Sequence, residues 1–361
     1  MSRMFHMLVR RRFLKSTSVL FRRVNLVILL LMSLASVSCV HEFPEPGELT
    51  EVRLTLTHEL PWSEYEYNYK RTGKSTRQNS AGSRNARYII RAYRQGDVTM
   101  PLYEFVRMSD DLTLQPFTTS ISLPEGEWDI YVWQEMTDSG KSFYLTSDFA
   151  QIGYADPYTG DTDCRDVFEG HTRVNVKASY EADHFIGADI SLERPVAKYV
   201  FIATDFGKFY DEVLLPANQG AVQGEKKAWS SLSLSERKEL LAGYSVTAYY
   251  PLFMPSVYDM FQQKAIDSTR GLRYKAEIEP ISDNEAVVSF DYVFMNHSES
   301  AVQVMLALRM PQGSETSMTP TVSVPLHRER ITYVRGEFLT TGANGGLNID
   351  FGFNDDYNIE L

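Results

Sequence analysis

Ser235 and Lys238 come nearest to the residue types and spacing of an enzyme, because a lysine three positions after a serine can activate its hydroxyl. Ser282-Asp283-Asn284 follows in the order found in serine β-lactamases and penicillin-binding enzymes. The third motif of those enzymes, Lys-Thr-Gly, is absent downstream. A helix start at Ser235 and a turn at Ser282–Asn284 explain both fragments better, so the sequence predicts no catalytic residues.

Phosphate and metal chemistry have equally weak support. Gly73-Lys74-Ser75-Thr76 ends like a phosphate-binding loop, but Asn68 stands where that loop needs its first glycine. The seven histidines are scattered without a ligand spacing, which predicts no zinc site. Four acids around Gly160 could hold calcium, although their spacing is not that of an EF-hand loop and a solvated turn is favoured: Asp156, Asp161, Asp163 and Asp166. We therefore expect no metal and no cofactor.

Glu135 and Asp138 are the first candidates for the paired carboxylates of glycoside cleavage, because Trp128 and Trp133 lie close to them in the sequence. Tryptophans in the core of a sheet explain this stretch more simply. The sequence therefore predicts a protein that is not an enzyme.

Cys39 follows a segment with the order of an export signal. The segment begins with basic residues and no acid, continues with the apolar run Val24–Ala35, and ends with the small residues Ser36-Val37-Ser38. An apolar run of about a dozen residues is too short to span a bilayer. This order resembles the bacterial lipoprotein signal, in which the cysteine is acylated, with an ordinary cleaved secretory peptide as the alternative. The sequence thus predicts a signal peptide over 1–38 and a lipid on Cys39.

The chain after the signal is acidic. All 47 Asp and Glu residues follow Cys39, and the formal net charge of the whole chain is −11. Such a chain repels phosphate backbones, so nucleic acid is not an expected partner. If Cys39 carries lipid, Cys164 has no disulfide partner, and the fold must rest on a hydrophobic core. Residues 39–49 are rich in Pro and Glu and are predicted to be a tether.

The elements predicted after the tether are mainly β-strands. Val52, Leu54 and Leu56 alternate with polar residues, which is the period of a strand. Further strands are predicted at 87–94, 127–136, 172–180, 188–192, 197–204, 244–250, 272–279, 286–295, 302–309, 332–338 and 347–353. Short strands separated by turn residues favour an all-β fold of β-sandwiches with a few short helices.

Two helices are predicted. Ser233 and Glu236 form a capping box before a helix that Gly243 ends, and a second helix runs from Asp205 to Val213. Pro195 cannot donate to a sheet ladder and therefore suits a junction. We predict one domain over 50–194 and a second over 195–361, and no internal repeat occurs at a fixed period.

Residues 63–87 are predicted to be a long loop. An aromatic group precedes or opens it and could stack on sugar rings: Trp62, Tyr65, Tyr67 and Tyr69. A strand edge followed by a solvated loop is the favoured alternative. The group nevertheless makes a surface glycan-binding lipoprotein the second functional hypothesis.

The C-terminal tail alternates apolar and polar residues to its end. The apolar positions are Leu347, Ile349, Phe351, Phe353, Tyr357, Ile359 and Leu361. A tail with this pattern pairs along a sheet edge, either of its own chain or of a neighbouring subunit. The last strand of the chain's own sheet is the favoured interpretation, and donation to another subunit is the functional alternative.

These features together resemble the fimbrillin-like lipoproteins of Bacteroidetes, which build type V pili. The stretches that match in style are Leu123–Trp133, Glu193–Tyr199 and Tyr333–Thr340. The resemblance covers about residues 39–361 and implies two transthyretin-like β-sandwich domains in tandem without enzymatic activity.

The resemblance also implies a function and partners. The protein would be an exported, lipid-anchored component of the outer membrane or cell surface. It would act as a fimbrial subunit, an anchor or an adhesion component that is assembled with other pilus subunits by strand addition. A host protein or glycan is a further possible partner. In such pili an arginine-specific protease removes the first strand of stalk subunits, whereas anchors keep their lipid. Arg53 is the arginine that lies inside the first predicted strand, and cleavage there would decide between the two roles.

Overall fold

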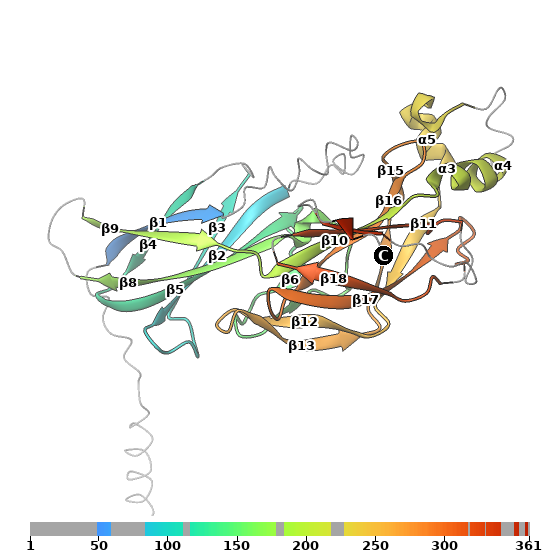
Figure 1. The fold of residues 1–361 in the computed structure, drawn as a ribbon. Helices are drawn as coiled ribbons and strands as arrows, with labels where there is room; N and C mark the ends of the chain where they lie inside the picture. Colours follow the sequence, from blue (N-terminus) through green and yellow to red (C-terminus); the bar gives the residue numbers. More distant parts are fainter. Residues whose placement is uncertain are drawn as a thin grey trace, which may run out of the picture. The chain divides into compact units, whose positions relative to one another are not determined.

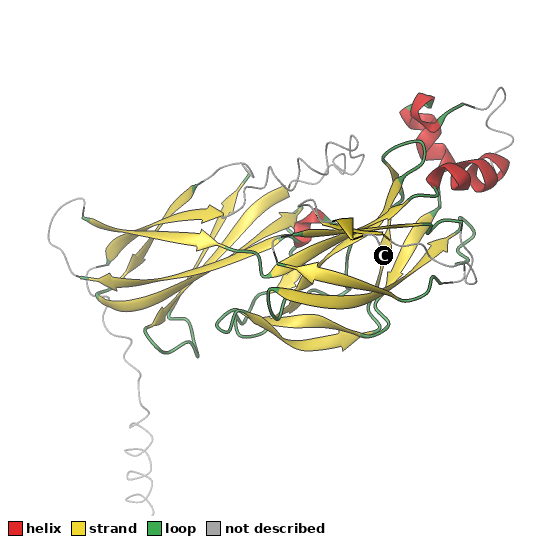
Figure 2. Cartoon of the chain, viewed as in Figure 1, coloured by secondary structure: helices red, strands yellow, loops and turns green. Residues whose placement is uncertain are grey.

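The computed structural model describes residues 49–58, 84–110, 116–177, 184–217, 227–316, 318–328 and 330–340, together with the backbone of 350–353 and 358–359. Residues Thr50–Leu361 form one compact unit. Strands dominate the described residues, as Figure 2 shows, and the all-β prediction is confirmed. None of the helices within these ranges has the length and apolar character needed to cross a membrane.

The first sandwich is built from two sheets whose order is β4-β1-β9 and β3-β2-β5-β8 (Figure 1). Its strands are β1 (Thr50–His58), β2 (Arg84–Arg94), β3 (Tyr103–Ser109), β4 (Phe117–Leu123), β5 (Gly126–Asp138), β8 (Val167–Val176) and β9 (Phe185–Leu192). The predicted alternation in β1 is confirmed, since Val52, Leu54 and Leu56 are buried in the core between the two sheets.

The second sandwich is built from sheets of order β15-β16-β10-β19-β20-β21 and β14-β11-β17-β18. Its strands are β10 (Val196–Ala203), β11 (Ser245–Tyr249), β14 (Arg273–Ala276), β15 (Glu279–Pro280), β16 (Ala286–Phe294), β17 (Glu299–Arg309), β18 (Val322–His327), β19 (Ile331–Gly336), β20 (Asp350–Phe353) and β21 (Asn358–Ile359). All eight residues of β10 are buried, because this strand has a hydrophobic core on each of its faces.

The two sandwiches share one seven-strand topology. In each, the first strand (β1 or β10) pairs antiparallel with the fourth (β4 or β16) and parallel with the last (β9 or β19). The second strand (β2 or β11) pairs with the third (β3 or β14) and the fifth (β5 or β17), and the fifth pairs with the sixth (β8 or β18). The sequence shows no repeat, so the duplication is visible only in the strand order.

Each sandwich also carries an insertion, and the two insertions form a sheet together. The first sandwich contributes β6 (Tyr144–Leu145) and β7 (Ile152–Tyr154), and the second contributes the hairpin of β12 (Phe253–Asp259) and β13 (Lys264–Arg270). The order of this composite sheet is β13-β12-β7-β6. It encloses a third core with residues from both sandwiches, among them Trp133, Phe149, Tyr258 and Phe294.

Short helices lie between β10 and β11. They are α3 (Phe206–Phe209), a π-helical turn (Tyr210–Leu214), α4 (Leu215–Ala217), a 3-10 turn (Trp229–Ser231) and α5 (Leu234–Leu240). The predicted capping box is confirmed, because the Ser233 hydroxyl accepts from the Glu236 amide and the Glu236 carboxylate accepts from the Ser233 amide.

Several sequence-based boundaries were wrong. Arg84–Arg87 belong to β2 and not to a loop, and the strand predicted to begin at Thr172 begins at Val167. The strands β3, β4, β6, β7, β12, β13 and β18 were not predicted. Pro255 in β12 and Pro325 in β18 explain two of these omissions, since proline argues against a strand in a sequence.

Candidate functional site

The fragments that suggested nucleophilic catalysis are structural. Ser235 lies in α5, where its hydroxyl is 3.1 Å from that of Ser233. Ser282 accepts hydrogen bonds from the backbone amides of Asn284 and Glu285, which is the geometry of a turn. Ser235 therefore belongs to the start of a helix and Ser282–Asn284 to a turn, as the sequence favoured.

Glu135, the candidate glycosidase carboxylate, is fully buried on β5. It pairs with Arg87 and accepts from the Ser142 hydroxyl at 2.9 Å and the Trp133 indole at 3.3 Å. Burial raises the pKa of Glu135, against the effect of Arg87. A carboxylate held by three donors of its own chain fixes the loop after β5 and is not directed at a substrate.

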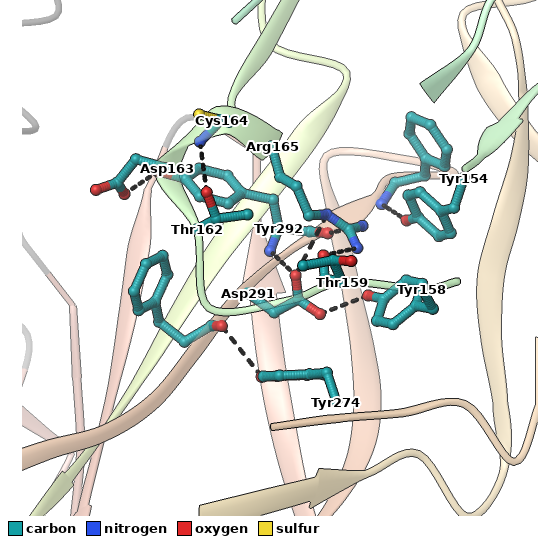
Figure 3. A network of polar contacts seen from close by, with 12 residues as sticks. Tyr154, Tyr158, Thr159, Thr162, Asp163, Cys164, Arg165, Tyr274, Asp291 and Tyr292 are labelled. Carbon is teal, nitrogen blue, oxygen red and sulfur yellow. Dashed lines mark hydrogen bonds and ion pairs between the residues drawn. The ribbon is translucent and has the colours of Figure 1, made fainter. Parts of the chain in front are cut away.

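The main polar site is a charged seam between the sandwiches, and Figure 3 shows its centre around Arg165 and Asp291. It begins with a 3-10 turn, η2 (Asp163–Arg165), in which the Cys164 amide donates to the Thr162 hydroxyl, and it includes the next residue, Asp166. Three side chains of this stretch have alternating charge, and each pairs with a residue from Arg194 onward. The pairs are Asp163 with Lys198, Arg165 with Asp291, and Asp166 with Arg194.

The pair of Arg165 and Asp291 lies at the centre of the seam. Both side chains are at most 1 % exposed, and Arg165 Nε is 3.4 Å from Asp291 Oδ1. The guanidinium donates to the carbonyl oxygens of Thr159 and Tyr292 at 3.1 and 2.9 Å. It also lies over the rings of Tyr154 and Tyr158, 4.1 and 4.4 Å from their centroids. Hydrogen bonds and aromatic faces thus compensate the loss of water around the cation.

Tyrosine hydroxyls complete the shell of Asp291. Tyr158 and Tyr250 donate to its Oδ2 at 2.5 and 2.7 Å, and Tyr199 lies 2.6 Å from Tyr250. Burial raises the pKa of Asp291, opposed by Arg165 and the two donors, and burial raises the pKa of each tyrosine well above its ordinary value. Tyrosines that hold their protons this firmly serve as hydrogen-bond donors and not as bases.

The outer pairs of the seam differ in exposure. Arg194 binds Asp166 with two parallel hydrogen bonds of 2.9 and 3.1 Å, and both side chains are 2 % exposed. Lys198 lies beneath the rings of Phe290 and Tyr292, with Nζ 2.7 Å from Asp163, whose side chain is 41 % exposed. The interpretation of this acidic stretch as a solvated turn was therefore wrong for Asp166, which is buried, whereas Asp156 is exposed. Among the described residues no group of acids, histidines or cysteines could hold a metal ion.

A second polar contact joins β8 to β12. The Tyr258 hydroxyl donates to the buried carboxyl of Glu169, whose backbone exchanges two 2.9 Å hydrogen bonds with Glu193. Burial raises the pKa of Glu169 to about 8, opposed by the Tyr258 hydrogen bond and by Arg328. Glu169 is therefore protonated at neutral pH and adds no unpaired charge to the third core.

Arg53 lies where the sequence placed it, in the first strand. β1 is the central strand of its sheet and pairs with β4 on one side and β9 on the other. The Arg53 side chain is exposed, pairs with Glu51 at 3.3 Å and stacks 3.8 Å over the ring of Phe185. Cleavage after Arg53 would divide a strand that is hydrogen-bonded along both edges.

The C-terminal tail pairs with the second sandwich. Residues of β20 pair antiparallel with β19, in the register Val334 with Phe351 and Thr332 with Phe353, and β21 pairs with β20. The segment before the tail is fixed by Asp205, whose carboxylate accepts from the backbone amides of Phe338, Leu339 and Thr340. The tail is therefore an additional strand on the outer edge of β19.

Several predicted residues lie outside the described residues. They are the signal and Cys39, the tether up to residue 48, the aromatic residues Trp62, Tyr65, Tyr67 and Tyr69, and the tail positions Leu347, Ile349, Tyr357 and Leu361. Sequence reasoning missed the partners of the seam. The one local signal of the seam in the sequence is the alternation of charge over Asp163, Arg165 and Asp166, and this stretch was considered only as a calcium site.

The duplicated strand order and the buried seam define a tandem β-sandwich protein. Residues 46–361 match a family of unknown function, DUF6562, and the chain belongs to this family. No curated protein matches the chain at a significant level.

Among solved structures the chain is similar to the fimbrial anchor protein Mfa2 of Porphyromonas gingivalis, with 11% identity over 86% of this chain and 99% of that chain and a TM-score of 0.39. It is similar to a candidate adhesin of Bacteroides thetaiotaomicron (8% identity, 86% and 97% coverage, TM-score 0.43). It is also similar to a candidate polysaccharide-binding protein of that species (8% identity, 84% and 96% coverage, TM-score 0.41). The fold described above rests on the strand registers of this chain and not on these similarities.

Proposed function

We propose that the chain is an exported, lipid-anchored surface protein that serves as a non-catalytic fimbrial or adhesion component and joins other subunits by strand addition. The observation that carries this proposal is the position of β20. Both sandwiches have the same seven strands, and the C-terminal segment adds β20 on the outer edge of β19 and β21 beyond β20. A terminal strand at a sheet edge is the element that a chain can give to a neighbour.

The lipid on Cys39 and the tether over 39–49 supply the attachment in this proposal. Stable anchoring by lipid takes more than one acyl chain, or one chain together with a second attachment. The protein would then extend from the outer membrane through the Pro- and Glu-rich segment. Replacing Cys39 by alanine is expected to abolish labelling by radioactive palmitate, and label that persists would contradict the anchor.

In this proposal, cleavage or retention of the bond after Arg53 distinguishes a stalk subunit from an anchor. If the chain is cut after Arg53, part of β1 can leave and open a groove between β4 and β9 that a neighbouring strand can fill. If β1 stays, the protein is an anchor that keeps its lipid. The N-terminus of the protein taken from intact cells distinguishes the two, because it is either a modified Cys39 or a residue that follows an arginine.

Strand addition is tested by removing the donor. Deleting Asp350–Leu361 removes β20 and β21, whereas the matched deletion of Tyr357–Leu361 leaves β20 in place. We expect the first deletion to abolish surface polymers in cells that export the chain, and the second to reduce them. Polymers of normal amount and length in both variants would overturn the proposal.

A further inference from the structure

The composite sheet has one covered face and one open face. Each of its strands gives a residue of the covered face to the third core: Tyr144, Ile152, Tyr258 and Ala265. Successive side chains of a strand point to opposite faces, so residues next to these lie on the open face. Among them are Leu145, Gly153, Val257, Lys264 and Ile266, of which the first three are paired in one row across the sheet. In Figure 1, β12 and β13 lie along the lower margin of the second sandwich.

The open face is apolar and exposed. Phe253 lies on the same side of β12 as Val257 and is 63 % exposed. The other exposed apolar side chains at this face are Leu145, Leu252 and Ile266. Gly153 keeps the middle of the face low, because a Cβ there would have one atom within 4 Å, a backbone carbonyl oxygen at 3.8 Å. Exposed apolar patches of this kind mark sites of contact with proteins or membranes.

The charges of the open face are positive. Lys264 and Arg270 lie on the same side of β13, and both are exposed. Asp267, the acid of β13, alternates with them and shares the side of the buried Ala265. Asp259, the acid of β12, is buried and accepts hydrogen bonds from two backbone amides of the hairpin turn. A cationic face on a chain of formal net charge −11 favours an anionic partner.

The open face suits a lipid surface better than other anionic partners. Exposed apolar side chains beside cations match the boundary between phospholipid headgroups and acyl chains. A second copy that met this face with its own open face would bring the same cations and be repelled. The predicted tether over 39–49 reaches at most about 40 Å when extended, so an anchor at Cys39 would hold the compact unit close to the membrane.

We propose that the open face binds the anionic phospholipid surface of the membrane in which Cys39 is anchored. This inference rests on the proposed lipid anchor and adds a second attachment, which the folded chain itself supplies. A single acyl chain needs a second attachment for stable anchoring, and a basic patch is one form of it. The third core supports the sheet from behind, so the open face is already formed before it meets the membrane.

Vesicle sedimentation tests this contact with the chain that remains after removal of the signal, residues 39–361, produced without acyl chains. The vesicles contain either equal amounts of phosphatidylethanolamine and phosphatidylglycerol, or phosphatidylcholine alone. We expect the chain to sediment with the anionic vesicles and to be released from them by added salt. With phosphatidylcholine it should stay in solution.

Substitutions on the open face separate its charge from its apolar surface. Lys264→Gln and Arg270→Gln should each lower partitioning about fivefold, which is the effect of one cation near an anionic surface. Phe253→Ser should lower partitioning without a change of charge, because it removes exposed apolar area. The matched controls lie on α5, where Leu234→Ser and Lys238→Gln remove an exposed apolar side chain and an exposed cation. These controls should partition like the parent, and all five variants should keep its melting temperature, since each changes an exposed side chain.

Four outcomes overturn the inference. They are a parent chain that does not bind anionic vesicles, equal binding to phosphatidylcholine, unchanged partitioning of the double variant Lys264→Gln with Arg270→Gln, and release by soluble glycerol phosphate, which would assign the face to a free phosphate. Self-association that Phe253→Ser abolishes in the absence of vesicles would assign the face to a second copy and also overturn it. The anchor is judged separately, because palmitate label that persists in Cys39→Ala refutes the anchor and leaves the vesicle result unchanged.

Discussion

At the scale of single residues, Arg165 and Asp291 dominate the seam because each is buried and each has the other as its counter-charge. Removing one partner leaves the other charge in a region without water, which costs about 3–5 kcal/mol of unfolding free energy. Replacing both by apolar residues of similar size removes that penalty. The pair thus determines how the two sandwiches fit together more than it adds net stability.

We expect Asp291→Ala to lower the free energy of unfolding by about 3–5 kcal/mol, measured by urea denaturation with tryptophan fluorescence. The double variant Arg165→Met with Asp291→Leu should recover most of this loss. Glu51→Ala removes the exposed pair with Arg53 and should change little. A single variant as stable as the parent would show that the seam is not a coupled pair.

Glu169 makes the stability of the chain depend on pH. Its pKa is about 8 in the folded chain and ordinary in the unfolded chain, so the folded chain holds one more proton between these values. Its contribution is therefore complete below the ordinary carboxyl pKa and is lost as the pH rises through about 8. The groups that influence it are Tyr258, Arg328, Glu193 and Asp259.

Glu169→Gln keeps the shape of the side chain and removes its proton equilibrium. Relative to the parent, this variant should gain more than about 1 kcal/mol of unfolding free energy between pH 5 and pH 8, measured by denaturant titration at each pH. An equal slope of stability against pH in both proteins would refute the role of Glu169.

The sequence predicts residues well where the signal is local. The capping box at Ser233 and Glu236 and the alternation in β1 were both correct, because each depends on neighbours within a few positions. The partners of Arg165 could not be predicted, since its charge is matched by a residue on a strand of the other sandwich. Nothing in the local sequence distinguishes such an arginine from a solvated one.

At the scale of elements, β1 is protected by its position between two strands. The backbone on both sides of Arg53 is paired, with β4 through residues 50–56 and with β9 through residues 51–58. A protease needs an extended segment free of its sheet, so the exposure of the Arg53 side chain does not make the bond accessible. Cleavage therefore requires β1 to be released first, or to occur before the sandwich has folded.

We expect an arginine-specific protease to leave the Arg53 bond of the folded chain intact for much longer than the Arg270 bond. Arg270 ends the edge strand β13 and precedes the turn at Gly271, and its side chain is likewise exposed. Mass spectrometry of the fragments over time measures both bonds in one sample. Equal cleavage rates would mean that β1 leaves the sheet readily.

Elements with strong alternation or apolar runs were predicted, whereas those that depend on partners were missed. β13 is mainly polar and exposed, and it pairs because β12 lies beside it. β6 and β7 contain two and three residues and are strands only because they join the composite sheet. Such elements have no signal of their own in the sequence.

At the scale of the whole molecule, the third core makes the described unit cooperative. It contains Trp133 and Phe149 from the first sandwich and Val200 and Phe294 from the second. Separating the two would expose these side chains to water together with the seam. The division into domains at 194 and 195 stays a prediction, and the structure adds that each part supplies a face that the other covers.

We expect the chain to unfold in a single calorimetric transition. Residues 50–194 produced alone should bind a hydrophobic dye, because Ile89, Trp133 and Phe149 lose their cover from the second sandwich. Two separate transitions in the full chain, or an isolated part with the thermal stability of the whole, would contradict this coupling.

The composite sheet has a consequence for how such a protein can change over generations. Its two hairpins come from different halves of the chain and pair through Val257 with Gly153 and Tyr258 with Ile152. A recombination event that imported one half from a relative would combine hairpins that do not pair in register. The third core would then be left exposed to water. We therefore expect exchange of halves between relatives to be disfavoured, and changes in loops to be tolerated better.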